Sequence, residues 1–227
     1  MVVLSFSKLL ETRSLAPDVI TRVVTLAFGA LWVLQVFKLN FEEPQLLPTE
    51  HQIIGHISSL FKTIFKVGYR ELKEASMATS GSQIAQSISA TFRRTLPCLH
   101  VISRWMKINL DVACIKNPKT TASGHQDGQF AFSFWSSYAT FLNRLLGVFP
   151  LQSLPPVTVR FEEDEELRGF RPLEEESENS VSSLVYASSS TVHPNDEHLM
   201  RIRDVISSGL EIAKHEASTR NFVYNTV

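Results

Sequence analysis

The 227-residue sequence contains only two cysteines and nine glycines. Cys98 and Cys114 form no CxxC pair and are accompanied by no paired-histidine motif, so we expect two reduced thiols rather than a disulfide or a zinc site. The glycines are not grouped in a phosphate-binding loop, and the lysine that such a loop requires is missing. The sequence therefore gives no support to a nucleotide-binding enzyme or to a disulfide-stabilised secreted domain.

Motifs for other kinds of catalysis are also missing. The seven histidines include no HExxH spacing, and the serines include no GxSxG motif. The acidic run at 162–166 does not alternate its carboxylates around a glycine, as a calcium-binding loop does. We therefore predict a protein that is not an enzyme, with no catalytic residues, no cofactor and no metal ion.

The most apolar uncharged run in this sequence is short. It extends from Val23 to Phe37, 15 residues between Arg22 and Lys38, whereas a membrane-spanning helix needs about 20 apolar residues. The N-terminus lacks the basic region and the cleavage site of a signal peptide. We expect a buried helix of a helical bundle here, and the alternative is a membrane segment.

Apolar residues are plentiful, at 44% of the sequence with 15 phenylalanines, which is enough for a sizeable core. Their spacing follows the helical period in several segments, and no strand-like segments alternate with them. We predict helices over 4–13, 17–39, 49–73, 83–94, 96–107, 130–149 and 196–217. The predicted fold is all-α, with helical hairpins stacked side by side in an α-solenoid-like arrangement.

The segment 161–173, FEEDEELRGFRPL, is expected to close the packed region as a docked loop. Leu167 and Phe170 lie three residues apart and are the predicted anchors, while Gly169 allows a positive φ. We expect the five acids before them to face solvent or a partner. Arg168 is predicted to fold back onto a carboxylate and hold the loop, and the alternative is an arginine that binds a partner.

The segment 161–173 also marks a predicted domain boundary. Residues 1–173 form the helical domain, and the serine-rich, acidic stretch 174–195 is predicted to be a flexible linker. Residues 196–217 form a helix that packs back on the domain, and 218–227 form a tail. Phosphorylation of serines between Ser177 and Ser190 would make the linker more negative.

Positive charge is left in surplus outside this acidic region. Residues 160–178 hold 9 of the 23 acidic and 3 of the 22 basic residues. On the helix expected at 49–73, the basic residues are spaced three or four apart and share one face, which could follow a phosphate backbone. An ordinary solvated helix face is the alternative. The candidate nucleic-acid contacts are Lys62, Lys66, Arg70, Lys73, Arg93 and Arg94.

Four segments, taken in order, resemble the helical DNA/RNA-binding region of the Est and SMG adaptor family of telomerase activation and nonsense-mediated mRNA decay. They are LPCLHVISRWM at 96–106, FWSSYATFLNRL at 134–145, FEEDEELRGFRPL at 161–173 and RIRDVISSGLEIA at 201–213. The third is the most specific, because its acid-acid-x-x-Leu-x-Gly-Phe-x-x-Leu pattern is matched throughout. One departure is His100, which stands where the resemblance leads us to expect a lysine.

The resemblance covers about residues 15–215 and implies an α-helical adaptor. It also implies that the phosphopeptide-reading domain and the nuclease-like PIN domain of some relatives lie outside this sequence. We therefore expect a non-catalytic scaffold that binds protein partners of the mRNA surveillance or telomerase machinery, in the cytoplasm or the nucleus. Two alternatives stay open: a module that binds RNA or single-stranded DNA through the basic helix face, and a membrane-associated helical protein.

Overall fold

The computed structural model describes residues 2–40, 48–78, 84–110, 126–174 and 192–215. These residues form α-helices and short 3-10 helices without a β-sheet, so the predicted all-α class is confirmed for the described part of the chain. The long helices are α1 (Val2–Glu11), α2 (Pro17–Asn40), α3 (Pro48–Ala78), α4 (Ala90–Ile108), α6 (Gln126–Val148) and α8 (Pro194–Lys214). The short ones are η1 (Ile84–Ser87), η2 (Leu151–Ser153), α7 (Glu162–Glu166) and η3 (Arg171–Leu173).

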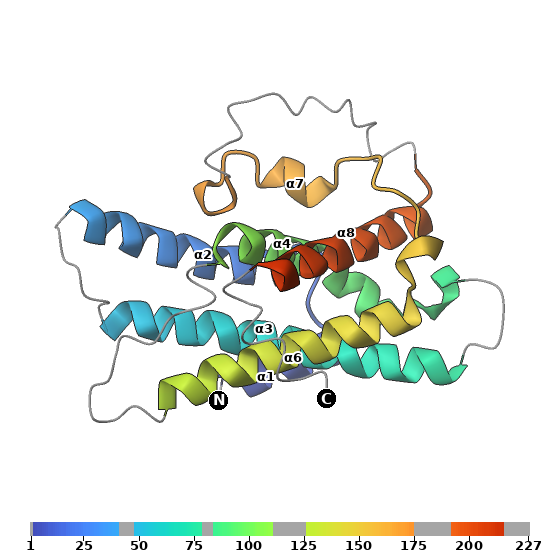
Figure 1. Ribbon diagram of the computed structural model, residues 1–227, viewed down its shortest axis with the longest axis horizontal. Helices are drawn as coiled ribbons and strands as arrows, with labels where there is room; N and C mark the ends of the chain where they lie inside the picture. Colours follow the sequence, from blue (N-terminus) through green and yellow to red (C-terminus); the bar gives the residue numbers. More distant parts are fainter. Residues whose placement is uncertain (1, 41–47, 79–83, 111–125, 175–191, 216–227) are drawn as a thin grey trace.

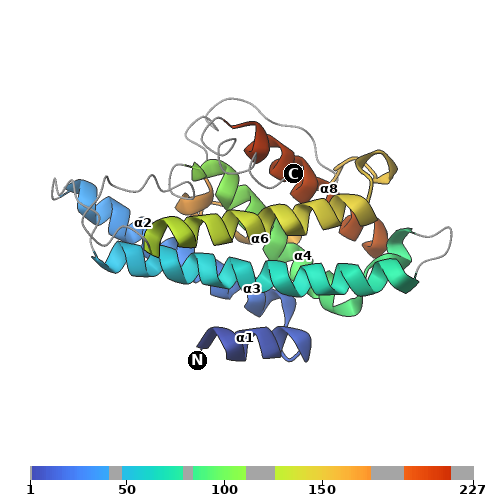
Figure 2. The ribbon, with the colours of Figure 1, turned by 60° about the horizontal axis from the view of Figure 1, so that its bottom comes forward.

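Helices α3 and α4 form the centre of the molecule. In Figure 1, α3 runs beside α6, and α4 lies between α2 and α8. Figure 2 shows α1 on the outer side of α3. The most extensive contacts join α3 to α6 and α4 to α8, which are not consecutive in the chain. The solenoid-like stacking of consecutive hairpins is therefore not established by this packing.

Aromatic side chains fill the space between these helices. Phe28 of α2 stacks on Trp105 of α4 at 4.6 Å between ring centroids, and Phe61 of α3 meets the same indole edge-on. Phe65 of α3 stacks on Phe141 of α6. Aromatic pairs of this kind contribute about 0.5–1.5 kcal/mol each beyond the apolar area that they bury.

The structure corrects the prediction of a helix break at Pro97. Helix α4 continues through Pro97 and begins instead at Ala90. The preceding residue, Ser89, caps it: its hydroxyl accepts a hydrogen bond from the backbone N–H of Phe92. An interior proline costs about 3 kcal/mol or more, because it removes a backbone hydrogen bond and crowds the preceding turn. The buried positions around it, such as Leu96 and Leu99, offset that cost through packing.

Two further boundaries differ from the sequence prediction. Helix α6 begins at Gln126, four residues before the predicted start at residue 130. Helix α8 is capped by His193, whose Nδ1 accepts from the backbone N–H of Asn195, and Pro194 occupies its first turn. Proline is favoured there because the first turn needs no donor from it. The expected linker lies mostly outside the described residues, as do the serines from Ser177 to Ser190 and the predicted tail.

Candidate functional site

Residues 157–174, which we call the closing segment, lie across α4 and α8. Phe161 precedes α7 and is 1% exposed, and Leu173 in η3 is 2% exposed. Between these ends the chain turns at Gly169, where φ is +77°, a conformation that glycine adopts without steric cost. The segment is thus fixed to the helical body at both ends.

A buried ion pair joins the closing segment to α8. Glu163 accepts two hydrogen bonds from Arg201, each 2.8 Å long, and both side chains are about 5% exposed. Arg201 also pairs with Glu197 at 2.7 Å, and its guanidinium lies 4.7 Å from the Phe161 ring centroid. The expectation that all five acids face solvent or a partner is therefore wrong for Glu163. Bidentate pairing fixes orientation as well as distance, so this contact sets the position of α7.

A second buried contact joins the closing segment to both α4 and α8. One ring nitrogen of His100 lies 2.8 Å from Asp164, and the other lies 2.8 Å from Asp204. Burial alone lowers the pKa of His100, but the hydrogen bonds to Asp164 and Asp204 and their charges outweigh it and raise the pKa to about 10. His100 is therefore an imidazolium at neutral pH, donating one hydrogen bond to each carboxylate.

Asp164 also pairs with a second cation. Arg104, one turn after His100 on α4, donates to Asp164 at 3.3 Å. Burial raises the pKa of Asp164, but the His100 hydrogen bond and the charges of His100 and Arg104 reverse that effect and lower the pKa below its usual value. Asp164 is thus a carboxylate at neutral pH, directed into the protein.

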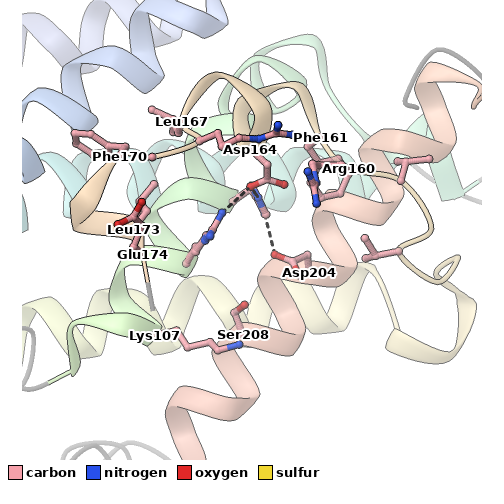
Figure 3. A pocket seen from close by; sticks show the side chains of 16 residues that line it. Lys107, Arg160, Phe161, Asp164, Leu167, Phe170, Leu173, Glu174, Asp204 and Ser208 are labelled. Carbon is pink, nitrogen blue, oxygen red and sulfur yellow. Dashed lines mark hydrogen bonds and ion pairs between the residues drawn. The ribbon is translucent and has the colours of Figure 1, made fainter. Parts of the chain in front are cut away.

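A cavity of about 480 Å³ opens beside these pairs, bounded by α4, α8 and the closing segment. Asp164 and Asp204 both contact His100 in its wall. Figure 3 shows Lys107 and Ser208 at one end of the cavity and Leu167 and Phe170 at the other. Charged and apolar side chains thus line the same cavity. The volume lies in the range of protein ligand sites.

The predicted anchors of the loop all lie at this cavity, but they are not equally buried. Leu167 and Phe170 are half-buried and pack on the main core, Phe170 beside Gly29 of α2. Arg168 does fold back onto a carboxylate, Glu165, but its side chain is 66% exposed. Exposed pairs of this kind contribute about 0–1 kcal/mol. The deeper attachments are Phe161, Glu163 and Leu173, which the sequence prediction did not name as anchors.

The predicted nucleic-acid contacts on α3 differ in exposure and in partners. Lys62 is half-buried and donates to Ser133 of α6 at 2.8 Å; burial and the nearby Lys66 lower its pKa. Arg70 pairs with Glu11 of α1. Lys66 and Lys73 are exposed.

Arg93 and Arg94 on α4 are engaged in the fold. Arg93 donates to the carbonyl oxygens of Ile88 and Ala85, and Arg94 donates to that of Leu15. Both arginines therefore tie the start of α4 to neighbouring segments.

A groove of about 440 Å³ lies where α1, α3 and α6 meet. It takes Lys66 and Arg70 from α3, together with the aromatic ring of Tyr69. Residues with hydroxyl groups from α1 and α6 complete the groove, and none of its lining residues is a carboxylate. The hydroxyl residues are Ser7, Ser136, Ser137 and Thr140.

Helix α2 buries one face and exposes the other. Ile20, Val24, Phe28 and Leu31 are at most 2% exposed. On the opposite face Leu26 is 74% exposed, Val33 60% and Phe37 54%. The sequence expectation of a buried bundle helix therefore holds for one side of α2 only. We call Leu26, Val33 and Phe37 the outer face of α2.

Helix α2 is also long and apolar enough to cross a membrane, judged by length and composition over Pro17–Leu39. Within an apolar 18-residue window of this helix, 33% is buried in the helical body. A single helix of this kind is weak evidence for a membrane span, because the core helix of a soluble protein passes the same test. Among the described residues, no group of three or more histidine, cysteine or acidic side chains could hold a metal ion.

Sequence reasoning missed the buried pairs around His100 and Arg201. One available signal was the spacing of complementary charges. His100 and Arg104 are four apart on α4, Arg201 and Asp204 are three apart on α8, and such spacings place side chains on one helix face. Which acids they would meet depends on how α7 docks, and no local pattern contains that information.

A model of the Est1 DNA/RNA binding domain matches residues 3–177 of this chain. The match includes α1 to α6 and the whole closing segment, and it ends before α8. Neither a curated protein nor a solved structure gives a significant match.

Proposed function

Because the chain belongs to the Est1 DNA/RNA binding domain family, we propose that it is a non-catalytic adaptor that binds protein partners of the mRNA surveillance or telomerase machinery. It would act in the cytoplasm, the nucleus or both. The family match supports a nucleic-acid-binding or adaptor role in general. The outer face of α2 is the observation that favours protein binding.

Leu26, Val33 and Phe37 lie seven and four residues apart, so they form a row along one side of α2. Contiguous exposed apolar surface marks interaction sites. Covering each of these side chains would contribute about 1.5–3 kcal/mol before the cost of association is subtracted. A row of this geometry fits the apolar face of a partner helix.

The test replaces the three residues by glutamine, Leu26→Gln, Val33→Gln and Phe37→Gln, in the full chain. Affinity purification from cells followed by quantitative mass spectrometry should recover mRNA surveillance or telomerase proteins with the wild type. The triple variant should recover them at least tenfold less well. Leu210→Gln, at a 39% exposed apolar position on α8, is the matched control and should change nothing.

Two outcomes would overturn this proposal. If the triple variant recovers these proteins as well as the wild type does, the outer face of α2 is not the surface that binds them. Flotation of the wild-type chain with phosphatidylcholine vesicles, abolished by the triple variant, would show that this face binds a membrane instead.

Nucleic-acid binding is the second candidate function, and the α3 groove favours it. Lys66 and Arg70 supply positive charge, Tyr69 supplies a ring on which a base could stack, and two helices, α1 and α6, supply hydroxyl groups. Cations combined with an aromatic platform are the usual elements of single-strand binding.

The corresponding test replaces Lys62, Lys66 and Arg70 by glutamate and measures the anisotropy of a labelled single-stranded RNA at low salt. If the groove binds RNA, affinity should fall at least tenfold and the salt dependence should weaken. Lys214→Glu, an exposed position at the end of α8, is the control. Unchanged RNA affinity in the triple variant would exclude this groove.

A further inference from the structure

The cavity between α4, α8 and the closing segment has more positive than negative groups in its lining. Its carboxylates belong to Asp164, Asp204 and Glu174. Its cations are His100, Arg104, Lys107, Arg160 and Arg168. The five cations outnumber the three carboxylates in the lining itself, while Glu165 pairs with Arg160 and Arg168, and Glu211 with Lys107, from outside it.

The carboxylates deepest in this cavity are already engaged. Asp164 and Asp204 both bind His100, and Asp164 also receives Arg104. Glu174 at the rim pairs with Arg171, whose side chain does not line the cavity. The anionic groups are therefore committed to holding the closing segment in place, and they present little negative charge to a ligand.

The cations at the rim are held less firmly. Arg160 and Arg168 share one carboxylate, Glu165, and their side chains are 41% and 66% exposed. Exposed ion pairs contribute only about 0–1 kcal/mol. An incoming oxyanion can therefore compete with Glu165 for these guanidinium groups, and the planar guanidinium binds carboxylate and phosphate oxygens in pairs.

Apolar surface lies directly beside these cations. Leu167 and Phe170 line the cavity while only half-buried, and Val157 lines its wall. A bare inorganic ion would gain nothing from these side chains. A peptide that carries an anionic side chain next to apolar residues would use both kinds of surface.

We propose that this cavity binds an oxyanion carried on a peptide, either a carboxylate or a phosphorylated side chain, through Arg160 and Arg168 with Arg104 behind them. The charges converge on one cavity, whereas a polynucleotide requires cations arranged along a track. The inference deepens the proposed adaptor function by naming the chemistry of a partner segment. It involves none of the α2 residues on which that proposal depends.

The test uses the full chain and three labelled short peptides that differ at one central position, which is phosphoserine, glutamate or alanine between leucines. Fluorescence anisotropy should show that the phosphoserine or the glutamate peptide binds at least tenfold more tightly than the alanine peptide. The double variant Arg160→Gln with Arg168→Gln should lose this preference. Inorganic phosphate alone, as competitor, distinguishes recognition of the anion from recognition of the peptide.

Arg171→Gln is the matched control. Arg171 belongs to the same segment, is 71% exposed and pairs three residues away with Glu174, as Arg168 pairs with Glu165, but it does not line the cavity. It should leave the preference for the anionic peptide unchanged. Circular dichroism and the unfolding midpoint should confirm that both variants keep the fold.

Equal binding of the three peptides, or equal loss in Arg171→Gln and in the double variant, would overturn the inference. It would also be overturned if single-stranded RNA displaced the peptide and lost affinity in the same double variant. Loss of peptide binding in Leu26→Gln, Val33→Gln, Phe37→Gln would instead assign the contact to α2, so the two proposals can fail separately.

Discussion

The buried pair of Glu163 and Arg201 shows how much a single residue can contribute to the stability of the fold. Removing one member of a buried, hydrogen-bonded ion pair leaves the other charge buried without a partner, which costs about 3–5 kcal/mol. We therefore expect Arg201→Met to lower the free energy of unfolding by this amount, because Glu163 is 4% exposed. Urea unfolding followed by circular dichroism measures the change.

The control for this prediction is Arg168→Met. Arg168 pairs with Glu165 in solvent, so its loss should cost at most about 1 kcal/mol. Equal costs for the two variants would show that the Glu163–Arg201 pair is not desolvated in solution.

His100 predicts how stability depends on pH. Its folded-state pKa, about 10, lies above the unfolded value of about 6.5. The stabilising contribution of His100 is therefore fully present below a pH of about 6.5, and it is lost as the pH rises through about 10. The lowered pKa of Asp164 acts in the opposite direction, so its contribution is lost in acid.

The measurement compares urea unfolding of the wild type and of His100→Gln across this pH range. The stability difference between the two proteins should be largest near neutral or mildly acidic pH and should shrink toward pH of about 10. Lysines and tyrosines titrate in both proteins and cancel in the difference. A difference that stays constant with pH would mean that His100 is neutral in the fold.

At the scale of helices, substitutions at two glycines distinguish the effect of packing on stability from the effect of helix propensity. A Cβ at Gly209 of α8 would lie 2.5 Å from Leu142 Cδ1 of α6 and 3.2 Å from the Tyr138 hydroxyl, whereas a Cβ at Gly55 of α3 would meet nothing within 4 Å. Alanine favours the helix by about 1 kcal/mol at either position. We expect Gly55→Ala to be stabilising by about 0.5–1 kcal/mol.

Gly209→Ala should instead be destabilising by about 1 kcal/mol, because overpacking of a buried contact costs about 1–3 kcal/mol and outweighs the gain in propensity. Thermal and urea unfolding of the two single variants measure both signs. Stabilisation by both substitutions would show that α6 and α8 separate easily.

The element scale also shows what local pattern can and cannot predict. The 3.6-residue period identified α2 with nearly correct ends, because the spacing of apolar residues is a local property. It also placed the start of α3 within one residue, but α3 continues to Ala78, five residues beyond the predicted end at 73. The same reading missed the passage of α4 through Pro97. Local propensity disfavours that proline, and only burial of its neighbours against other helices offsets the cost.

For the whole molecule, the main core cluster runs from Phe6 in α1 to Ile212 in α8. Elements that share one core are expected to unfold together. Urea transitions followed by tryptophan fluorescence and by far-ultraviolet circular dichroism should therefore coincide, and Arg201→Met should shift both equally. Fluorescence of Trp105 and Trp135 reports on the centre of this core, where they are 4% and 1% exposed.

Separate transitions for the two signals would contradict this prediction. They would mean that part of the helical body, such as α8 with the closing segment, unfolds before the rest. The double variant of the cavity, Arg160→Gln with Arg168→Gln, should leave the coincidence intact, because both side chains lie in solvent at its rim.

The sequence by itself determined the all-α class, the family and the special character of residues 161–173, because apolar period, missing motifs and a local residue pattern are all contained in the chain. Only the tertiary structure decided that Glu163 and Asp164 point inward, that α2 exposes an apolar row, and that Arg70, Arg93 and Arg94 bind within the protein. His100 and Asp204 are 104 residues apart, and such a pairing exists only when α4 and α8 pack together. The physical reason is that charge pairing and burial depend on distances in space, which helical periodicity does not specify.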